Sequence, residues 1–113
     1  MTSDNALWLR IGDSDYALPL DKVRYIIPIK DIRLQTFPTS KVPLWGLLVY
    51  NGQLIPVLKI DFLPPNPHSK TGYYVVYYLI NEWVAIWVDE CIGFRQFEGT
   101  FLDLSPWRLT YET

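Results

Sequence analysis

The chain has 113 residues, of which 50% are apolar and 16% are aromatic, so disorder is excluded and one domain with a sizeable core is expected. Ten basic residues stand against twelve acidic ones, and the formal net charge of -2 gives no indication of nucleic-acid binding or of an anionic membrane. No uncharged run reaches the roughly 20 apolar residues of a membrane span, and the N-terminus lacks a signal-peptide pattern. The lack of such a run predicts no membrane insertion, and because Cys91 is the single cysteine, we expect a reducing, cytoplasmic location.

The N-terminal part of the chain is predicted to form short strands. Residues 6–20 indicate two strands around a Gly-Asp-Ser-Asp turn. Residues 21–27 fit one helical turn with Asp21 as N-cap, and Pro28 ends it because the residue before a proline is pushed out of the helical region. Residues 29–35 resemble a half-exposed strand, and residues 36–43 are predicted to be loop.

An Asn51-Gly52 pair interrupts the apolar stretch "GLLVYNGQLIPVLKID" and predicts a hairpin with a type I′ turn. In that register Tyr50 faces Gln53, and Leu47 faces Pro56 at a pair without mutual hydrogen bonds. The missing N–H of Pro56 then points away from its hairpin partner, which places the proline at a sheet edge or a bulge.

A second hairpin is predicted at residues 73–88, after a proline-rich linker at 63–72. With Asn81-Glu82 as its loop, Ile80 faces Trp83. Both of its faces are apolar, so the ribbon lies between two layers or presents one face to a partner. One face carries Val75, Tyr77, Leu79, Val84, Ile86 and Val88, and the other carries Tyr74, Val76, Tyr78, Ile80, Trp83, Ala85 and Trp87.

Residues for catalysis or metal binding are scarce. The only histidine, His68, lies in the linker, and one His with one Cys cannot form a zinc quartet. Cys91 is interpreted as a small buried hydrophobe with a raised thiol pKa. Asp89 and Glu90 are adjacent on a strand and point to opposite faces, so they make a poor acid/base pair. The sequence therefore predicts no enzyme, no metal and no cofactor.

Three segments resemble the CheW-like family of chemotaxis adaptor domains: the N-terminal hairpin leading into "DKVRYI", the "NGQLIPVLKI" hairpin and "VAIWVDECIGF". The resemblance implies an all-β fold of two small Src-homology-3-type barrels packed side by side, in one domain of residues 1–113. The lobes would comprise residues 20–62, and residues 1–19 with 70–113. It also implies a non-enzymatic adaptor that bridges chemoreceptors and the histidine kinase CheA.

The sequence departs from the family pattern at three positions, two of which, Tyr25 and Asn51, lie in the family's partner-binding region. Asn51 stands where the family has Arg, Tyr25 where it has Glu, and Lys59 where it has Asp. Family members also continue further beyond the segment that resembles "VAIWVDECIGF". The second barrel is therefore expected to lack closing strands, with residues 100–104 as at most one short strand.

The resulting hypothesis is a scaffold in chemosensory or motility signalling that docks a CheA-type histidine kinase, a chemoreceptor cytoplasmic domain, or both. The expected partner-binding residues are Tyr25, Tyr50, Asn51, Gln53 and Leu54, although Leu54 fits a core position equally well. The alternatives are a small-ligand or oligonucleotide-binding barrel that uses the face of Trp83 and Trp87, and a homodimeric module in which the same two tryptophans mediate self-association.

Overall fold

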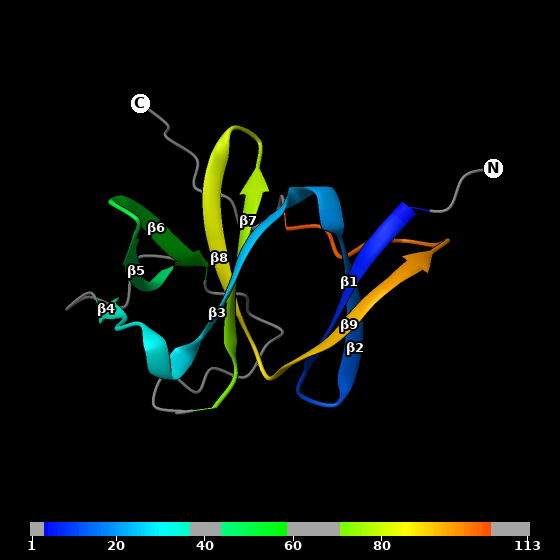
Figure 1. The fold of residues 1–113 in the computed structure, drawn as a ribbon, viewed down its shortest axis with the longest axis horizontal. Helices are drawn as coiled ribbons and strands as arrows, with labels where there is room; N and C mark the ends of the chain where they lie inside the picture. Colours follow the sequence, from blue (N-terminus) through cyan, green and yellow to red (C-terminus); the bar gives the residue numbers. More distant parts are fainter. Residues whose placement is uncertain (1–3, 37–43, 59–70, 105–113) are drawn as a thin grey trace.

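The computed structural model describes residues 4–36, 44–58 and 71–104, which form two β-sheets and two 3-10 turns (Figure 1). The three-stranded sheet has the order β2 (Ser14–Pro19), β1 (Asp4–Ile11), β9 (Glu90–Phe97). The six-stranded sheet has the order β3 (Val23–Pro28), β7 (Tyr73–Leu79), β8 (Glu82–Val88), β6 (Gln53–Leu58), β5 (Leu44–Tyr50), β4 (Gln35–Thr36). The all-β prediction is confirmed, and no helix in these three segments has the length and hydropathy of a membrane span.

The predicted N-terminal hairpin is present as β1 and β2, with Ile11 opposite Ser14 across the turn. Gly12 occupies that turn with a φ of 62°, and its N–H donates to Asp89 Oδ2 at 2.6 Å. The Asp89 N–H in turn donates to the Arg10 carbonyl at 2.9 Å. Asp89 therefore fastens the β1–β2 turn to the junction between β8 and β9.

The helical turn predicted at residues 21–27 is wrong. A 3-10 turn, η1, spans Leu20–Lys22, its N-cap is Pro19 without a side-chain hydrogen bond, and the next residues form β3. The β-branched and aromatic residues of β3 favour the extended conformation in which it pairs with β7.

The strand predicted at residues 29–35 is also mostly wrong. Ile29–Asp31 form a second 3-10 turn, η2, and only Gln35–Thr36 pair with β5. Ile29 and Ile32 pack against a core three residues apart, which is a helical and not an alternating spacing. Residues 37–43 and 59–70, which include His68 and most of the predicted linker, lie outside the described residues.

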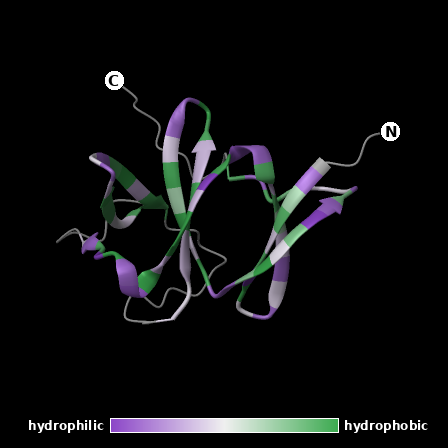
Figure 2. Ribbon diagram, in the orientation of Figure 1, coloured by the Kyte–Doolittle hydropathy of each residue, from purple (hydrophilic) through white to green (hydrophobic). Residues whose placement is uncertain are grey.

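The hairpin β7–β8 separates two hydrophobic cores, as its two apolar faces predicted. The first core combines alternate residues of this hairpin with the three-stranded sheet, and the second combines the other residues with β5 and β6. Hydrophobic residues accordingly recur along β6 and β8 (Figure 2). The first core includes Leu7, Leu9, Leu18, Val75, Val84 and Ile86, and the second includes Ile27, Leu48, Ile55, Val57, Tyr74, Val76 and Ala85.

The turn of this hairpin lies one residue earlier than predicted. Ile80 and Asn81 have positive φ angles of 46° and 66°, and Leu79 faces Glu82. The pairing register consequently shifts by two residues, and a shift of two leaves every side chain on its predicted face. The assignment of residues to faces is therefore right although the turn is wrong.

The Asn51-Gly52 turn is confirmed, with φ angles of 49° and 75° and with Tyr50 opposite Gln53. Pro56 faces Leu47 as predicted, but β6 is not at the edge of the sheet. It lies between β5 and β8, and it pairs with β8 only through Val57 and Ala85. The part of β6 that precedes Pro56 therefore does not pair with β8.

The first core is covered in part by the segment that follows β9. Residues 100–104 form no strand, yet the Leu102 N–H donates to the Ala17 carbonyl at 2.9 Å and Leu104 is buried in the first core. On the opposite face of β7–β8, the side chains of Leu48, Ile55 and Val57 cover the second core. Residues of the chain therefore pack on both faces of this hairpin, and self-association through Trp83 and Trp87 stays a prediction.

Candidate functional site: an aromatic docking surface

The predicted binding residues gather where β3, β5 and β6 approach one another. The rings of Tyr25 on β3 and Tyr50 on β5 lie 4.7 Å apart between centroids, at 63° to each other. Asn51, held in the turn by its left-handed backbone, donates from Nδ2 to Tyr25 Oη at 3.4 Å. The hydrogen bond from Asn51, followed by that from Arg24, lowers the pKa of Tyr25 below its ordinary value.

These contacts give the sequence departures a structural meaning. Tyr25 and Asn51 replace two residues of the CheW-like pattern, and they lie in direct contact although 26 positions separate them in the chain. A neutral tyrosine–asparagine pair occupies both positions. The centre of this surface is therefore aromatic and amide in character, without a charged pair.

Arg24 belongs to the same surface but was missed from the sequence. Its guanidinium carbon lies 5.3 Å from the Tyr25 ring centroid and 6.0 Å from that of Trp83. Contacts of this length are favourable cation–π interactions. The pairing of β3 with β7 shifts between Val23 and Tyr25, so Arg24 is the extra residue of an irregularity that redirects its side chain. Nothing in the local sequence marks this irregularity.

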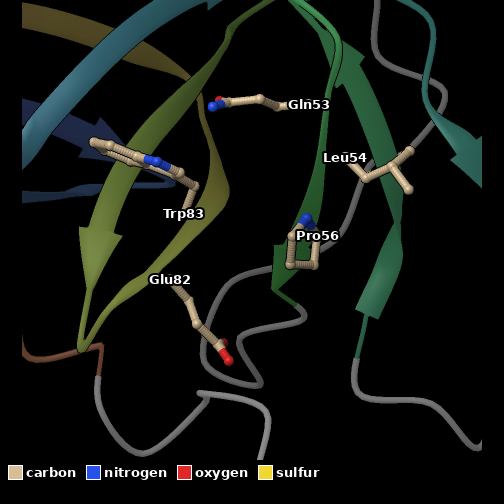
Figure 3. Close-up of a pocket in the computed structure, with 5 residues that line it drawn as sticks. All are labelled: Gln53, Leu54, Pro56, Glu82 and Trp83. Atoms are coloured by element: carbon tan, nitrogen blue, oxygen red, sulfur yellow. The ribbon is translucent and has the colours of Figure 1, made fainter.

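A hollow of about 370 Å³ adjoins the rings, between the N-terminal parts of β6 and β8. Gln53, Leu54, Pro56, Glu82 and Trp83 line it. In Figure 3, Gln53 and Trp83 extend toward each other from β6 and β8, while Glu82 lies on the other side of Pro56. The hollow is open to solvent on one side and combines apolar walls with one carboxylate and one amide.

Leu54 lies on the surface and not in the core. Its side chain is 67% exposed, and its cross-strand partner Val49 is 54% exposed. Such a pair of exposed aliphatic side chains is a feature of protein-binding surfaces, and it lies on the opposite face of the β5–β6 hairpin from the half-buried ring of Tyr50. The structure therefore brings Tyr25, Tyr50, Asn51 and Gln53 together, whereas Leu54 projects from the opposite face of the β5–β6 hairpin (Figure 3).

The two tryptophans proposed for self-association have different surroundings. Both pack against the second core, but Trp83 lines the hollow and its ring lies 4.7 Å from that of Tyr78. Trp87 faces Tyr74 across the hairpin, and its buried Nε1 has no hydrogen-bond partner among the described residues. Trp83 therefore belongs with the predicted docking residues, whereas Trp87 does not.

No other site for chemistry competes with this surface in the part of the chain that the structure describes. That part holds no group of three or more His, Cys, Asp or Glu side chains able to bind a metal. Burial raises the pKa of the Cys91 thiol to about 11, so the residue is a poor nucleophile near neutral pH. The raised pKa agrees with the sequence prediction and is caused by burial, although Cys91 is half-buried and not fully buried.

Comparison with known proteins identifies the architecture. A family model described as the CheW-like domain matches residues 5–103. A crystal structure of the scaffolding protein TtCheW from Thermoanaerobacter tengcongensis matches with a TM-score of 0.73 and 16% sequence identity, covering 86% of this chain and 67% of that one. A comparison with curated proteins found no match. At this identity the structural match shows the fold alone, and it confirms the CheW-like fold predicted from the sequence. The division into two lobes at the stated residues remains a prediction.

Proposed function

Because the chain belongs to the CheW-like domain family, we propose that it is a non-enzymatic, cytoplasmic adaptor in chemotaxis-type signal transduction. It would dock a CheA-type histidine kinase, a chemoreceptor cytoplasmic domain, or both. The surface formed by Tyr25, Tyr50, Asn51, Gln53 and Leu54 would bind the first partner. Such an adaptor acts by holding one partner beside another, so its function depends on interface energetics and requires no catalytic group.

One observation carries this proposal. The contact of Asn51 with Tyr25, and of Tyr25 with Tyr50, holds two half-buried tyrosine rings in fixed positions beside the exposed Asn51 and Gln53. Tyrosines held in this way are frequent anchors of interfaces because they bury a large area with little loss of side-chain freedom. The pattern is one of recognition between preformed surfaces.

The test is binding of a CheA-type regulatory domain, which is itself homologous to this family, by isothermal titration calorimetry. Tyr25→Ala should weaken binding by about 1–3 kcal/mol, or about five- to 150-fold, while leaving the unfolding midpoint nearly unchanged. Phe94→Ala is a matched control, because Phe94 is 63% exposed on β9 of the three-stranded sheet. Equal binding by the wild type and Tyr25→Ala would exclude this surface. No binding by the wild type to the kinase domain or to a receptor fragment would exclude the function.

A small-ligand site is the second candidate, and the hollow beside Trp83 is the observation that favours it. Its volume of about 370 Å³ falls at the lower end of the roughly 300–1,000 Å³ typical of ligand sites. Tryptophan fluorescence during titration with nucleotides or oligonucleotides would test this alternative, because Trp83 would respond to a ring stacked on it. The homodimeric module is tested separately by sedimentation of the purified protein.

A further inference from the structure

β6 and β8 are neighbours in the interior of the six-stranded sheet. The wedge-shaped space between them is therefore an opening inside the sheet and not a gap at its edge. The two strands meet only where Val57 faces Ala85, and they diverge toward their N-terminal ends (Figure 1). The hollow lies in this divergence, with Pro56 on one wall and Trp83 on the other. Tyr78, in contact with Trp83, supports the tryptophan ring from the neighbouring strand.

We propose that this hollow binds a proline-containing segment of a partner protein in the polyproline II conformation, with a basic residue of that segment paired to Glu82. The inference names the kind of segment that the partner would contribute at the docking surface, and it rests on the proposed function for the identity of that partner.

The backbone of β6 disfavours an added β-strand as the occupant. Tyr50 and Gln53 flank a two-residue turn and form a hydrogen-bonded pair, so the backbone groups of Leu54 and Pro56 point away from β5. Proline has no N–H, and Leu54 is therefore the only donor of these two residues toward the wedge. A strand needs alternating donors and acceptors along its length, and this edge offers too few of them.

A polyproline II segment needs no ladder of backbone donors. Its carbonyls accept hydrogen bonds from side chains, and its proline rings pack on aromatic faces. The hollow supplies the Gln53 amide and the indole of Trp83 as donors, and the Trp83 ring, which the Tyr78 ring contacts from the neighbouring strand, as aromatic surface. Arg24 lies over Trp83 on the side toward Tyr25 and can donate to further carbonyls.

Charge complementarity selects the basic residue. Glu82 lines the hollow, and the ion pairs found among the described residues, those of Arg10 with Asp15 and Glu90, do not include it. A lysine or arginine of the bound segment would pair with this carboxylate. Because polyproline II helices can bind in either chain direction, one charged contact at one end of the groove also fixes the orientation of the segment.

The experiment is an NMR titration of the full, isotopically labelled chain with synthetic peptides. The reference peptide carries two prolines in a P-x-x-P spacing followed by an arginine; in a second peptide alanines replace both prolines, and in a third glutamine replaces the arginine. The reference peptide should shift the Gln53 amide and the Trp83 indole resonances. The alanine peptide should bind at least about tenfold more weakly, because the rings lose their contacts.

A double-mutant cycle tests the charge contact. The glutamine peptide should bind wild-type protein about two- to fivefold more weakly than the reference peptide, as expected for a partly exposed ion pair. In Glu82→Gln that difference should vanish, whereas Glu98→Gln, an exposed change on the other lobe, should retain it. Gln53→Ala should weaken the reference peptide in a chain whose other resonances stay unchanged.

Two results would overturn the inference: equal binding of the alanine peptide, or shifts confined to residues outside the hollow. Either result would stand even if the kinase domain still bound in calorimetry, so the proposed function would survive it. Conversely, the peptide could bind at Gln53 and Trp83 while calorimetry detects no binding of the kinase domain. That result would support the peptide site and count against the kinase as partner.

Discussion

A methyl group at Gly46 should detach β4 from the six-stranded sheet. Gly46 lies in β5 opposite Thr36 of β4. A Cβ built on it would overlap the carbonyl oxygen of Gln35, and would lie 2.9 Å from the carbonyl carbon and 3.0 Å from Leu34 Cδ1. The obstructing atoms of Gln35 belong to the backbone, so a side-chain rotation cannot relieve the clash. We therefore expect Gly46→Ala to displace the strand itself.

The expected loss in free energy of unfolding depends on the interactions that hold β4 against β5. Its pairing with β5 consists of Gln35 with Leu47 and Thr36 with Gly46, and both β4 residues are exposed. Two lost hydrogen bonds at about 1 kcal/mol each give a destabilisation of about 2 kcal/mol. Accommodating the methyl group with β4 in place falls in the same range, about 1–3 kcal/mol. A loss of 2 kcal/mol corresponds to a decrease in Tm on the order of 10 °C.

Urea and thermal unfolding measure the loss, and amide hydrogen exchange locates it. The matched control is Gly12→Ala, because a Cβ on Gly12, which lies in the β1–β2 turn, meets nothing within 4 Å. Its cost is conformational, about 1 kcal/mol, since its φ is positive. The reasoning is refuted if Gly46→Ala is no less stable than Gly12→Ala, or if exchange at residues 35 and 36 is unchanged.

Further predictions concern the Asn51-Gly52 turn and the half-buried thiol of Cys91. Gly52→Val should lower the free energy of unfolding by about 1 kcal/mol or more, because a β-branched residue resists the φ of 75° found there; unchanged thermal unfolding would contradict the type I′ assignment. Cys91 should react with a disulfide reagent slowly at neutral pH, with half-maximal rate near pH 11, the pKa to which burial raises its thiol. Since this pKa lies above the ordinary value of 9.0, the thiol's contribution to stability is present below that pH and is lost between pH 9 and 11. Cys91→Ala should lose less stability over that interval, and an equal loss would mean that other groups, such as the buried Tyr74 and Tyr77, are responsible.

The accuracy of the sequence predictions depended on how local the controlling interaction is. The Asn51-Gly52 turn was predictable because its two residues tolerate positive φ without help from the rest of the chain. The turn of β7–β8 was not, because Ile80 adopts a φ of 46° that its branched side chain resists. Packing on both faces of the hairpin fixes that turn, and Tyr78 Oη donates to Asn81 Oδ1 at 3.2 Å across it.

The candidate site was predictable only where motif positions marked it. Tyr25 and Asn51 were found because they depart from a family pattern, and their contact confirms that the two positions belong together. Arg24 and Glu82 were missed because an irregular pairing places one and the divergence of two strands places the other. Neither feature has a local signature, since each depends on strands that come from distant parts of the chain.

A single pairing separates the core from the docking surface. Trp83 and Trp87 share a face of β8, with Ala85 between them, and β6 meets β8 only at Ala85. On the Trp87 side the indole nitrogen is buried, and a Cβ on Gly72 would lie 3.2 Å from it. On the Trp83 side, Pro56 has no N–H to donate, and β6 and β8 diverge toward their N-terminal ends. The hollow lies between the two diverging strands. Pro56 thus has a structural effect that its sequence position alone does not reveal, because the two central strands do not pair on its N-terminal side. The resulting opening has an aromatic wall and one carboxylate, and it lies beside the rings that are proposed to bind the partner.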